Sequence, residues 1–132
     1  MILDSDVLIT LLDPRCPRVL TERLAATPDV ICTTSICWAE IVYGLIRRAA
    51  SQRLRARYED SLLPALEVLS FDKLSAETYG EIRVRLECQG TPLDEADLMI
   101  AAIALRHDLP IATGNVRHFE RVPGLRVEDW LG

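Results

Sequence analysis

Acidic side chains stand in three separate apolar segments of the chain, and these residues are the best suited to chemistry. Asp4 closes the apolar N-terminal run, Glu40 lies inside an apolar helical pattern, and Asp97 precedes a third apolar run. A buried carboxylate is costly unless it is paired, hydrogen-bonded or bound to a metal ion. We therefore expect Asp4, Glu40 and Asp97 to converge on one hard cation, which would make the chain a Mg²⁺- or Mn²⁺-dependent enzyme.

Two of these acids have clear structural alternatives. Asp4 could cap a following helix, although Asp6 could take that position and Ser5 could orient Asp4 by a hydrogen bond. Glu40 could be an ordinary surface glutamate. Its helical pattern is apolar on most faces, however, which predicts a buried helix in which Glu40 needs a partner.

A fourth acid, Asp94, lies three residues before Asp97 and hence on the same helical face. Capping and a favourable interaction with the helix dipole explain Asp94 well. They explain Asp97 less well, because the residues that follow it are apolar. Asn115 comes just after a strand expected to end at Thr113, where it could be a neutral metal ligand or an ordinary turn residue. His118, nearby, is expected to pack beneath the closing loop or to stack on a base.

Carboxylates around a cation suit the cleavage of a phosphodiester. That reaction must neutralise phosphate charge and generate hydroxide near pH 7, and one or two divalent ions can do both. Zinc is disfavoured, because neither the four cysteines nor the two histidines have the spacing of a zinc site. The cysteines are expected to be buried thiols that act as small apolar residues.

The composition describes a folded chain. At 132 residues, with 49% hydrophobic and 27% charged residues, the chain is expected to form one globular domain over residues 1–132. No apolar run approaches the ~20 residues of a membrane span, and no basic segment precedes the apolar N-terminus as in a secretory signal. We therefore expect a cytoplasmic protein that does not enter a membrane.

Arginine supplies almost all of the positive charge. The net charge of −5 argues against a simple nucleic-acid-binding surface, but fourteen of the fifteen basic residues are arginines. Arginine binds phosphate through two parallel hydrogen bonds. One segment is therefore either a phosphate-binding surface or a solvated helix face. Its basic residues are Arg47, Arg48, Arg53, Arg55 and Arg57.

Short apolar runs alternate with longer helical patterns. Strands are expected at residues 1–4, 30–33, 66–71, 111–113 and 125–127, and helices at 7–12, 17–26, 35–50, 51–63, 75–90 and 94–106. This alternation predicts an α/β fold with a mainly parallel sheet covered on both faces. Sites in such sheets lie at the carboxyl ends of the strands, so Asp4 and Thr113 should share one rim.

Taken in order, these residues resemble the motifs of PIN-domain nucleases, in particular the VapC-type toxins of bacterial toxin–antitoxin pairs. The resemblance covers essentially the whole chain, and the ordered set of motifs is more specific than any one of them. The matching segments are residues 1–8, Ser35 with Glu40 and Gly44, residues 97–104, and residues 113–125.

The resemblance implies a PIN-like three-layer α/β/α sandwich that cuts RNA with Mg²⁺ or Mn²⁺ and arrests translation. It also implies a homodimer and a cognate antitoxin protein that blocks the site. Asp4, Glu40 and Asp97 would be the catalytic metal ligands. The supporting residues would be Ser5, Ser35 and Thr113.

The fourth ligand departs from the family pattern. Position 115, where the family often has Asp or Asn, is the uncharged Asn115, and position 6, commonly Asn in the family, is Asp6. Asn115, Asp94 and Asp6 therefore remain candidates for a further ligand, with one metal ion or two.

Two other interpretations stay open at this point. An apolar strand followed by Asp4-Ser5-Asp6 also resembles the start of haloacid-dehalogenase-like phosphatases, in which the first Asp is a nucleophile. That fold also needs a lysine and a later acidic pair, and Lys73 is the only lysine here. The non-enzymatic alternative is a PIN-like RNA-binding or interaction module without catalytic activity.

Overall fold

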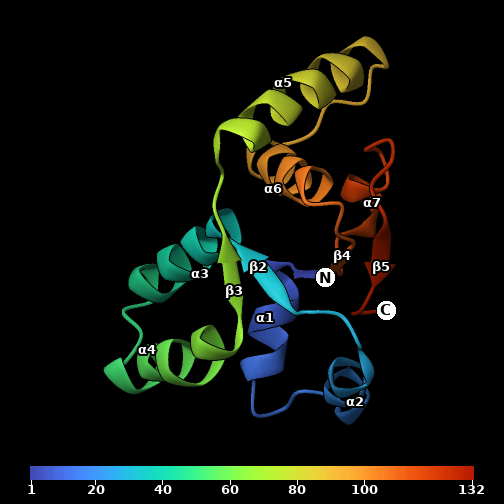
Figure 1. The fold of residues 1–132 in the computed structure, drawn as a ribbon. Helices are drawn as coiled ribbons and strands as arrows, with labels where there is room; N and C mark the ends of the chain where they lie inside the picture. The colour runs from blue at the N-terminus through green and yellow to red at the C-terminus, as the bar shows by residue number, and fades with distance from the viewer.

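Five short strands form one parallel sheet at the centre of the fold (Figure 1). The computed structural model describes the backbone of residues 1–132 and the side chains of all of them except residue 62. The sheet order is β3-β2-β1-β4-β5, and every pairing is parallel. The strands are β1 (Ile2–Leu3), β2 (Cys32–Thr34), β3 (Glu67–Leu69), β4 (Ile111–Thr113) and β5 (Val127–Asp129). The expected α/β class with its parallel sheet is confirmed.

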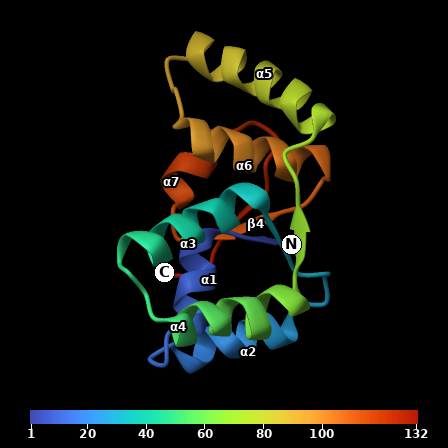
Figure 2. The ribbon, with the colours of Figure 1, turned by 90° about the vertical axis from the view of Figure 1, so that its left-hand side faces the viewer.

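Helices cover both faces of this sheet (Figures 1 and 2). One face packs against α5, α6 and α7, and the other packs against α1, α2 and α4. Helix α3 lies along the edge beside β2 and β3, and it contributes Cys37 to the first core and Ile41 to the second. The helices are α1 (Ser5–Leu12), α2 (Arg18–Ala26), α3 (Ser35–Arg47), α4 (Gln52–Arg57), α5 (Lys73–Cys88), α6 (Glu95–Arg106) and α7 (Val116–Phe119).

The central strand β1 sends alternate residues into the two cores. Ile2 packs in the core beneath α6, and Leu3 packs in the core beneath α1. Both are fully buried, as expected for a strand covered on both faces. Since β2 and β4 flank β1 in parallel, their carboxyl ends open at the same rim. Asp4 and Thr113 lie at this rim.

Several expected boundaries are wrong for local reasons. Helix α5 begins at Lys73 instead of Ser75, because Asp72 caps it by accepting the backbone N–H of Ser75. Helix α3 ends at Arg47 instead of continuing to residue 50, because Ala49 adopts a positive φ of 47°. The expected long helix over 51–63 is divided into α4, a π-helical turn (Tyr58–Leu62) and a 3₁₀ turn (Leu63–Ala65).

The last strand lies two residues later than expected. Val127 pairs with Ile111 in the register that joins β5 to β4, so β5 covers Val127–Asp129 instead of 125–127. Two cysteines, Cys32 and Cys37, are buried as expected, but Cys88 is exposed. Among the residues described, no helix is both long and apolar enough to cross a membrane.

Candidate metal-dependent active site

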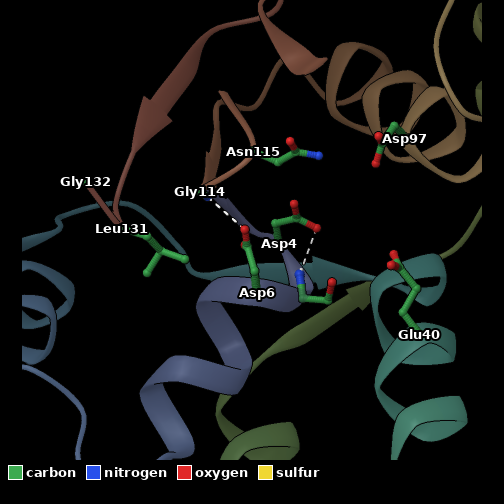
Figure 3. A pocket seen from close by; sticks show the side chains of 9 residues that line it. Asp4, Asp6, Glu40, Asp97, Gly114, Asn115, Leu131 and Gly132 are labelled. Atoms are coloured by element: carbon green, nitrogen blue, oxygen red, sulfur yellow. Dashed lines mark hydrogen bonds between the residues drawn. The ribbon is translucent and has the colours of Figure 1, made fainter. Parts of the chain in front are cut away.

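Four acidic residues from three parts of the chain surround one pocket of about 500 Å³. In Figure 3, Asp4 at the end of β1, Glu40 on α3 and Asp97 on α6 point toward the same space. The fourth acid is Asp6, on α1. The lining residues are Asp4, Ser5, Asp6, Glu40, Asp97, Gly114, Asn115, Leu131 and Gly132. Asp4, Glu40 and Asp97 therefore line one pocket, and their binding of a cation stays a prediction.

Asp4 is buried, with 6% of its surface exposed, and its carboxylate is held by neighbours on both sides. Oδ1 accepts the backbone N–H of Ser5 at 2.8 Å and faces the thiol of Cys37 at 3.6 Å. Oδ2 accepts the hydroxyl of Thr113 at 2.8 Å. Burial raises the pKa of Asp4, although the hydrogen bond from Thr113 opposes that rise. Asp4 therefore caps α1 and lines the pocket at once.

Glu40 lies on an exposed face of α3, so the sequence-based expectation of a helix buried on most faces is wrong. Only one stripe of α3 is buried, at Cys37, Ile41 and Leu45. Partial burial of its carboxyl group, together with the charges of Asp4, Asp97 and Asp6, nevertheless raises the pKa of Glu40 to about 7. At neutral pH the side chain is therefore close to the midpoint of its titration.

Asp97 occupies the first turn of α6, and 17% of its side chain is exposed. Its Oδ2 lies 2.9 Å from Nδ1 of His118, which also lies 2.8 Å from the side-chain amide of Asn115. Asp94 stands at the N-cap of α6 as expected, but its side chain makes no capping hydrogen bond. Asp94 is exposed and does not belong to the residues that line the pocket.

Asp6 lines the pocket, but hydrogen bonds engage both of its carboxylate oxygens. Oδ1 accepts the backbone N–H of Val7 at 2.7 Å, and Oδ2 accepts that of Gly114 at 3.0 Å. Burial, followed by the charge of Asp4, raises the pKa of Asp6. A Cβ at position 114 would lie 2.8 Å from Cδ1 of Leu131 and 3.0 Å from Oδ2 of Asp6, so glycine allows the contact without displacing either side chain. Asp6 thus ties α1 to the loop after β4.

The expected supporting residues act in different ways. Thr113 bonds Asp4 directly, whereas Ser5 contributes its backbone N–H. Helix α3 is capped by Thr34, whose hydroxyl accepts the N–H of Cys37 at 3.0 Å. Ser35 is outside the set of described residues that line the pocket.

Three contributions to this region were not predicted. His118 contacts Asp97 instead of simply packing beneath a loop. Leu131 and Gly132 line the pocket because β5 returns the chain end to the rim (Figure 3). The third is α7, whose four residues are too few to give a periodic pattern. The spacing Asn115-x-x-His118 was the one sequence signal for the position of His118, because side chains three residues apart can meet across a short helical turn.

The charge balance of the pocket fits a bound cation. Neither lysine nor arginine belongs to the described residues that line it, whereas four carboxylates do. Burial first, and neighbouring negative charges second, raise the pKa of Glu40 and Asp6, and a divalent ion would counter the repulsion among these charges. The acidic side chains offer oxygen ligands, which suit Mg²⁺ and Mn²⁺. Asp4, Cys37 and Glu40 present ligand atoms within 4.8 Å of one another, and Asp94, Asp97 and His118 form a second such group.

An all-parallel sheet with an acidic pocket at its carboxyl rim is typical of α/β enzymes that act on phosphate esters, among them nucleases. A family model for the PIN domain matches residues 1–125. The chain is 39% identical to the tRNA(fMet)-specific endonuclease VapC of Salmonella typhimurium, over 86% of each chain. It is 35% identical to the Shigella flexneri enzyme of that name, over 97% of this chain and 96% of the relative.

Solved structures agree with these relatives. The DNA-bound VapBC structure from Salmonella typhimurium superposes with a TM-score of 0.88 at 36% identity, covering 98% of this chain and 96% of the other. The structure of VapBC-1 from nontypeable Haemophilus influenzae superposes with a TM-score of 0.86 at 27% identity, covering 99% of this chain and 98% of the other. The chain belongs to the PIN-domain family, and within it to the VapC-type ribonucleases. This membership sets aside the phosphatase alternative.

Proposed function

We propose that the chain is the toxin of a toxin–antitoxin pair and that it cuts RNA with Mg²⁺ or Mn²⁺ held by Asp4, Glu40 and Asp97. The observation that carries the proposal is the convergence of these three carboxylates on one pocket that no basic residue lines, within the described part of the chain. The relatives with VapC names are ribonucleases, which supports RNA as the substrate. The inactive-module alternative has no comparable observation in its favour.

The chain's own residues would prepare this site in three ways. Thr113 and Ser5 orient Asp4, so its remaining lone pairs face the pocket without further rearrangement. Glu40 contributes negative charge as it ionises near pH 7. Asp6 adds charge, but its two backbone contacts direct both oxygens away from a primary ligand role. A bound divalent ion would activate a water molecule and neutralise phosphate charge.

A structured tRNA is the substrate class that we propose to test first. The Salmonella typhimurium and Shigella flexneri relatives are named tRNA(fMet)-specific endonucleases. Exposed arginines at the end of α3 and on α4, including Arg47, Arg53 and Arg55, would contact the phosphate backbone. A tRNA substrate is compatible with action in the cytoplasm.

The proposed protein partners are an antitoxin and a second copy of the chain. Solved neighbours titled VapBC, and one titled as a toxin–antitoxin complex from Klebsiella pneumoniae, support the first. Exposed apolar side chains support the second, because Tyr43 and Ile46 on α3 are 64% and 62% exposed. We propose that this face of α3 takes part in a homodimer.

The proposal is tested by incubating the purified chain with a tRNA pool that contains tRNA(fMet), in Mg²⁺, Mn²⁺ or EDTA. We expect cleavage with metal, none with EDTA, and a loss of more than about 100-fold in Asp97→Asn. Asp108→Asn is the matched control, since Asp108 is 98% exposed and its left-handed backbone suits asparagine. Equal cleavage by Asp97→Asn, or cleavage that persists in EDTA, would contradict the proposed site.

A further inference from the structure

His118 faces Asp97 through a single ring nitrogen. Nδ1 lies 2.9 Å from Oδ2 of Asp97 and 2.8 Å from Nδ2 of Asn115. The residues are separated in sequence, since Asp97 belongs to α6 whereas Asn115 and His118 belong to the turn that forms α7. The contact therefore joins the acidic pocket to the loop after β4.

The chemistry of the three groups assigns the proton. An unprotonated Nδ1 would direct its lone pair at the Asp97 carboxylate, which is repulsive, so Nδ1 carries hydrogen and donates to Oδ2. The structure places Nδ2 of Asn115 at 2.8 Å from Nδ1, so the Asn115 amide must turn over to present its oxygen to the same N–H, because an N–H cannot accept a hydrogen bond. The two ends of an amide exchange by rotation about its terminal bond. This arrangement commits the Asn115 oxygen to His118.

Packing does not explain the position of His118. Its side chain is 38% exposed, whereas the neighbouring Phe119 is fully buried and fills the core beneath this loop. Truncating Phe119 would open the core, but truncating His118 would mainly release Asp97. Asp4 at the same site is held differently, since Thr113 and Ser5 fix its carboxylate.

We propose that His118 is a positioning residue that fixes the carboxylate of Asp97 toward the pocket and that Asn115 supports His118 instead of binding metal. This inference rests on the metal-binding role proposed for Asp97. Histidines and carboxylates that orient metal ligands through hydrogen bonds contribute to metal affinity without touching the ion. An amide at position 115 suits this role, because it holds the imidazole without adding charge.

The first test is Mn²⁺ binding to the free protein, followed by electron paramagnetic resonance, in His118→Leu and His118→Asn. Leucine removes the donor, and asparagine restores an N–H near the position of Nδ1. We expect His118→Leu to weaken Mn²⁺ binding by about 10- to 100-fold and His118→Asn to recover most of that loss. Thermal unfolding of both variants controls for folding.

The matched controls are His107→Leu and His107→Asn, which change the only other histidine, at the end of α6. They are expected to bind Mn²⁺ as the wild type does. Wild-type affinity in His118→Leu, or equal loss in the Leu and Asn variants, would overturn the inference while leaving the proposed nuclease intact. A wild type that binds no Mn²⁺ would instead remove the metal-dependent function, and this inference with it.

The second test measures directly which ring nitrogen of His118 carries the proton. Nitrogen-15 spectra of the histidine side chains, assigned with His107→Asn, should show His118 with its proton on Nδ1, both before and after addition of Mg²⁺. A ring protonated on Nε2 would contradict the hydrogen bond to Asp97. Loss of the Nδ1 proton on adding Mg²⁺ would make His118 a direct ligand and would also overturn the positioning role.

Discussion

The hydroxyl of Thr113 donates a hydrogen bond of 2.8 Å to Oδ2 of Asp4, although 109 positions separate the two residues in sequence. Thr113 ends β4 and Asp4 follows β1, so parallel pairing of these strands brings both side chains to one rim. Both residues are buried. The contact lowers the pKa of Asp4 against the larger effect of burial, and thereby keeps a buried carboxylate closer to its charged, metal-binding form.

Replacing Thr113 by valine should therefore weaken both folding and metal binding. Valine has a similar shape but no hydroxyl, so Asp4 loses its donor and the backbone N–H of Asn115 loses its acceptor. We expect the free energy of unfolding to fall by about 1–3 kcal/mol, because a buried polar group is left unpaired. Chemical denaturation gives this value, and Mn²⁺ titration gives the change in affinity.

Thr33→Val is the control for Thr113→Val. Thr33 is equally buried, but its hydroxyl donates to the backbone oxygen of Leu3 at 2.8 Å instead of to an acid. The Thr33→Val variant should lose stability without a comparable loss of Mn²⁺ affinity. If Mn²⁺ affinity fell equally in the two variants, the hydrogen bond between Thr113 and Asp4 would have no special role in the site.

Stability without metal should fall as the pH rises through about 7. The pKa of Glu40 is raised from 4.5 to about 7 in the folded chain, so the folded state binds more protons than the unfolded state between these values. The contribution of Glu40 to the free energy of unfolding is therefore full below pH 4.5 and is lost as the pH rises through 7. The raised pKa values of Asp4 and Asp6 act in the same direction.

Melting curves between pH 5 and 8.5, in EDTA and in Mg²⁺, measure this effect. In EDTA the melting temperature of the wild type should fall with rising pH, and that of Glu40→Gln should fall less. Mg²⁺ should stabilise the wild type more at pH 8 than at pH 5, because it binds the charged carboxylates. A wild-type melting temperature that rises from pH 6 to 8 in EDTA, or that is unaffected by Glu40→Gln, would contradict the assignment.

The close approach at Gly114 predicts a coupling between the pocket loop and the chain end. An alanine Cβ at position 114 would lie 2.8 Å from Cδ1 of Leu131 and 3.0 Å from Oδ2 of Asp6. We expect Gly114→Ala to cost about 1 kcal/mol, the low end for overpacking, because the Leu131 side chain is 39% exposed and can shift. Leu131→Ala should relieve at least about 0.5 kcal/mol of this cost.

Urea denaturation of the two single variants and the double variant measures that coupling. Gly80→Ala serves as the control, because Gly80 lies within α5 and a Cβ there meets nothing within 4 Å. It should stabilise the chain by about 1 kcal/mol, since alanine favours helix. Additive effects of Gly114→Ala and Leu131→Ala would show that residues 114 and 131 do not crowd each other in solution.

The arginines of α4 should control the salt dependence of RNA binding. Arg53 and Arg55 are exposed, and removing one phosphate-binding side chain should reduce the slope of log affinity against log salt by about 0.7–0.9, the range for single and double strands. Binding of tRNA to Asp97→Asn, with and without Arg53→Gln and Arg55→Gln, measures the change across salt concentrations. Arg83→Gln on α5 is the control, since Arg83 is paired with Glu87. An unchanged slope would favour a merely solvated helix face.

The convergence of Asp4, Glu40 and Asp97 could be predicted because it follows from rules that act along the sequence. Asp4 closes an apolar strand, and a parallel sheet brings the ends of its strands to one rim. Glu40 and Asp97 belong to helices whose periodic apolar faces pack beside the same sheet. The position of Glu40 and Asp97 near the rim can therefore be predicted from the order of the elements and the direction of each strand.

The remaining features depend on tertiary contacts that no local pattern encodes. The apolar residues Tyr43 and Ile46 suggest a buried α3, yet they are exposed on the isolated chain. The register of β5 is set by its partner β4, and this register alone carries Leu131 to the pocket. The contact of His118 with Asp97 joins a four-residue helix to α6, and such short segments have no reliable periodic signal.

A crystal structure of the chain soaked in Mn²⁺, with the ion located by its anomalous scattering, would show most directly whether the three converging acids bind one metal ion. We predict an anomalous peak within the pocket, coordinated by Asp4, Glu40 and Asp97, with His118 bonded to Asp97 and not to the ion. No peak at saturating Mn²⁺, or a peak held by Asp94 and His118 outside the pocket, would contradict the proposed metal site.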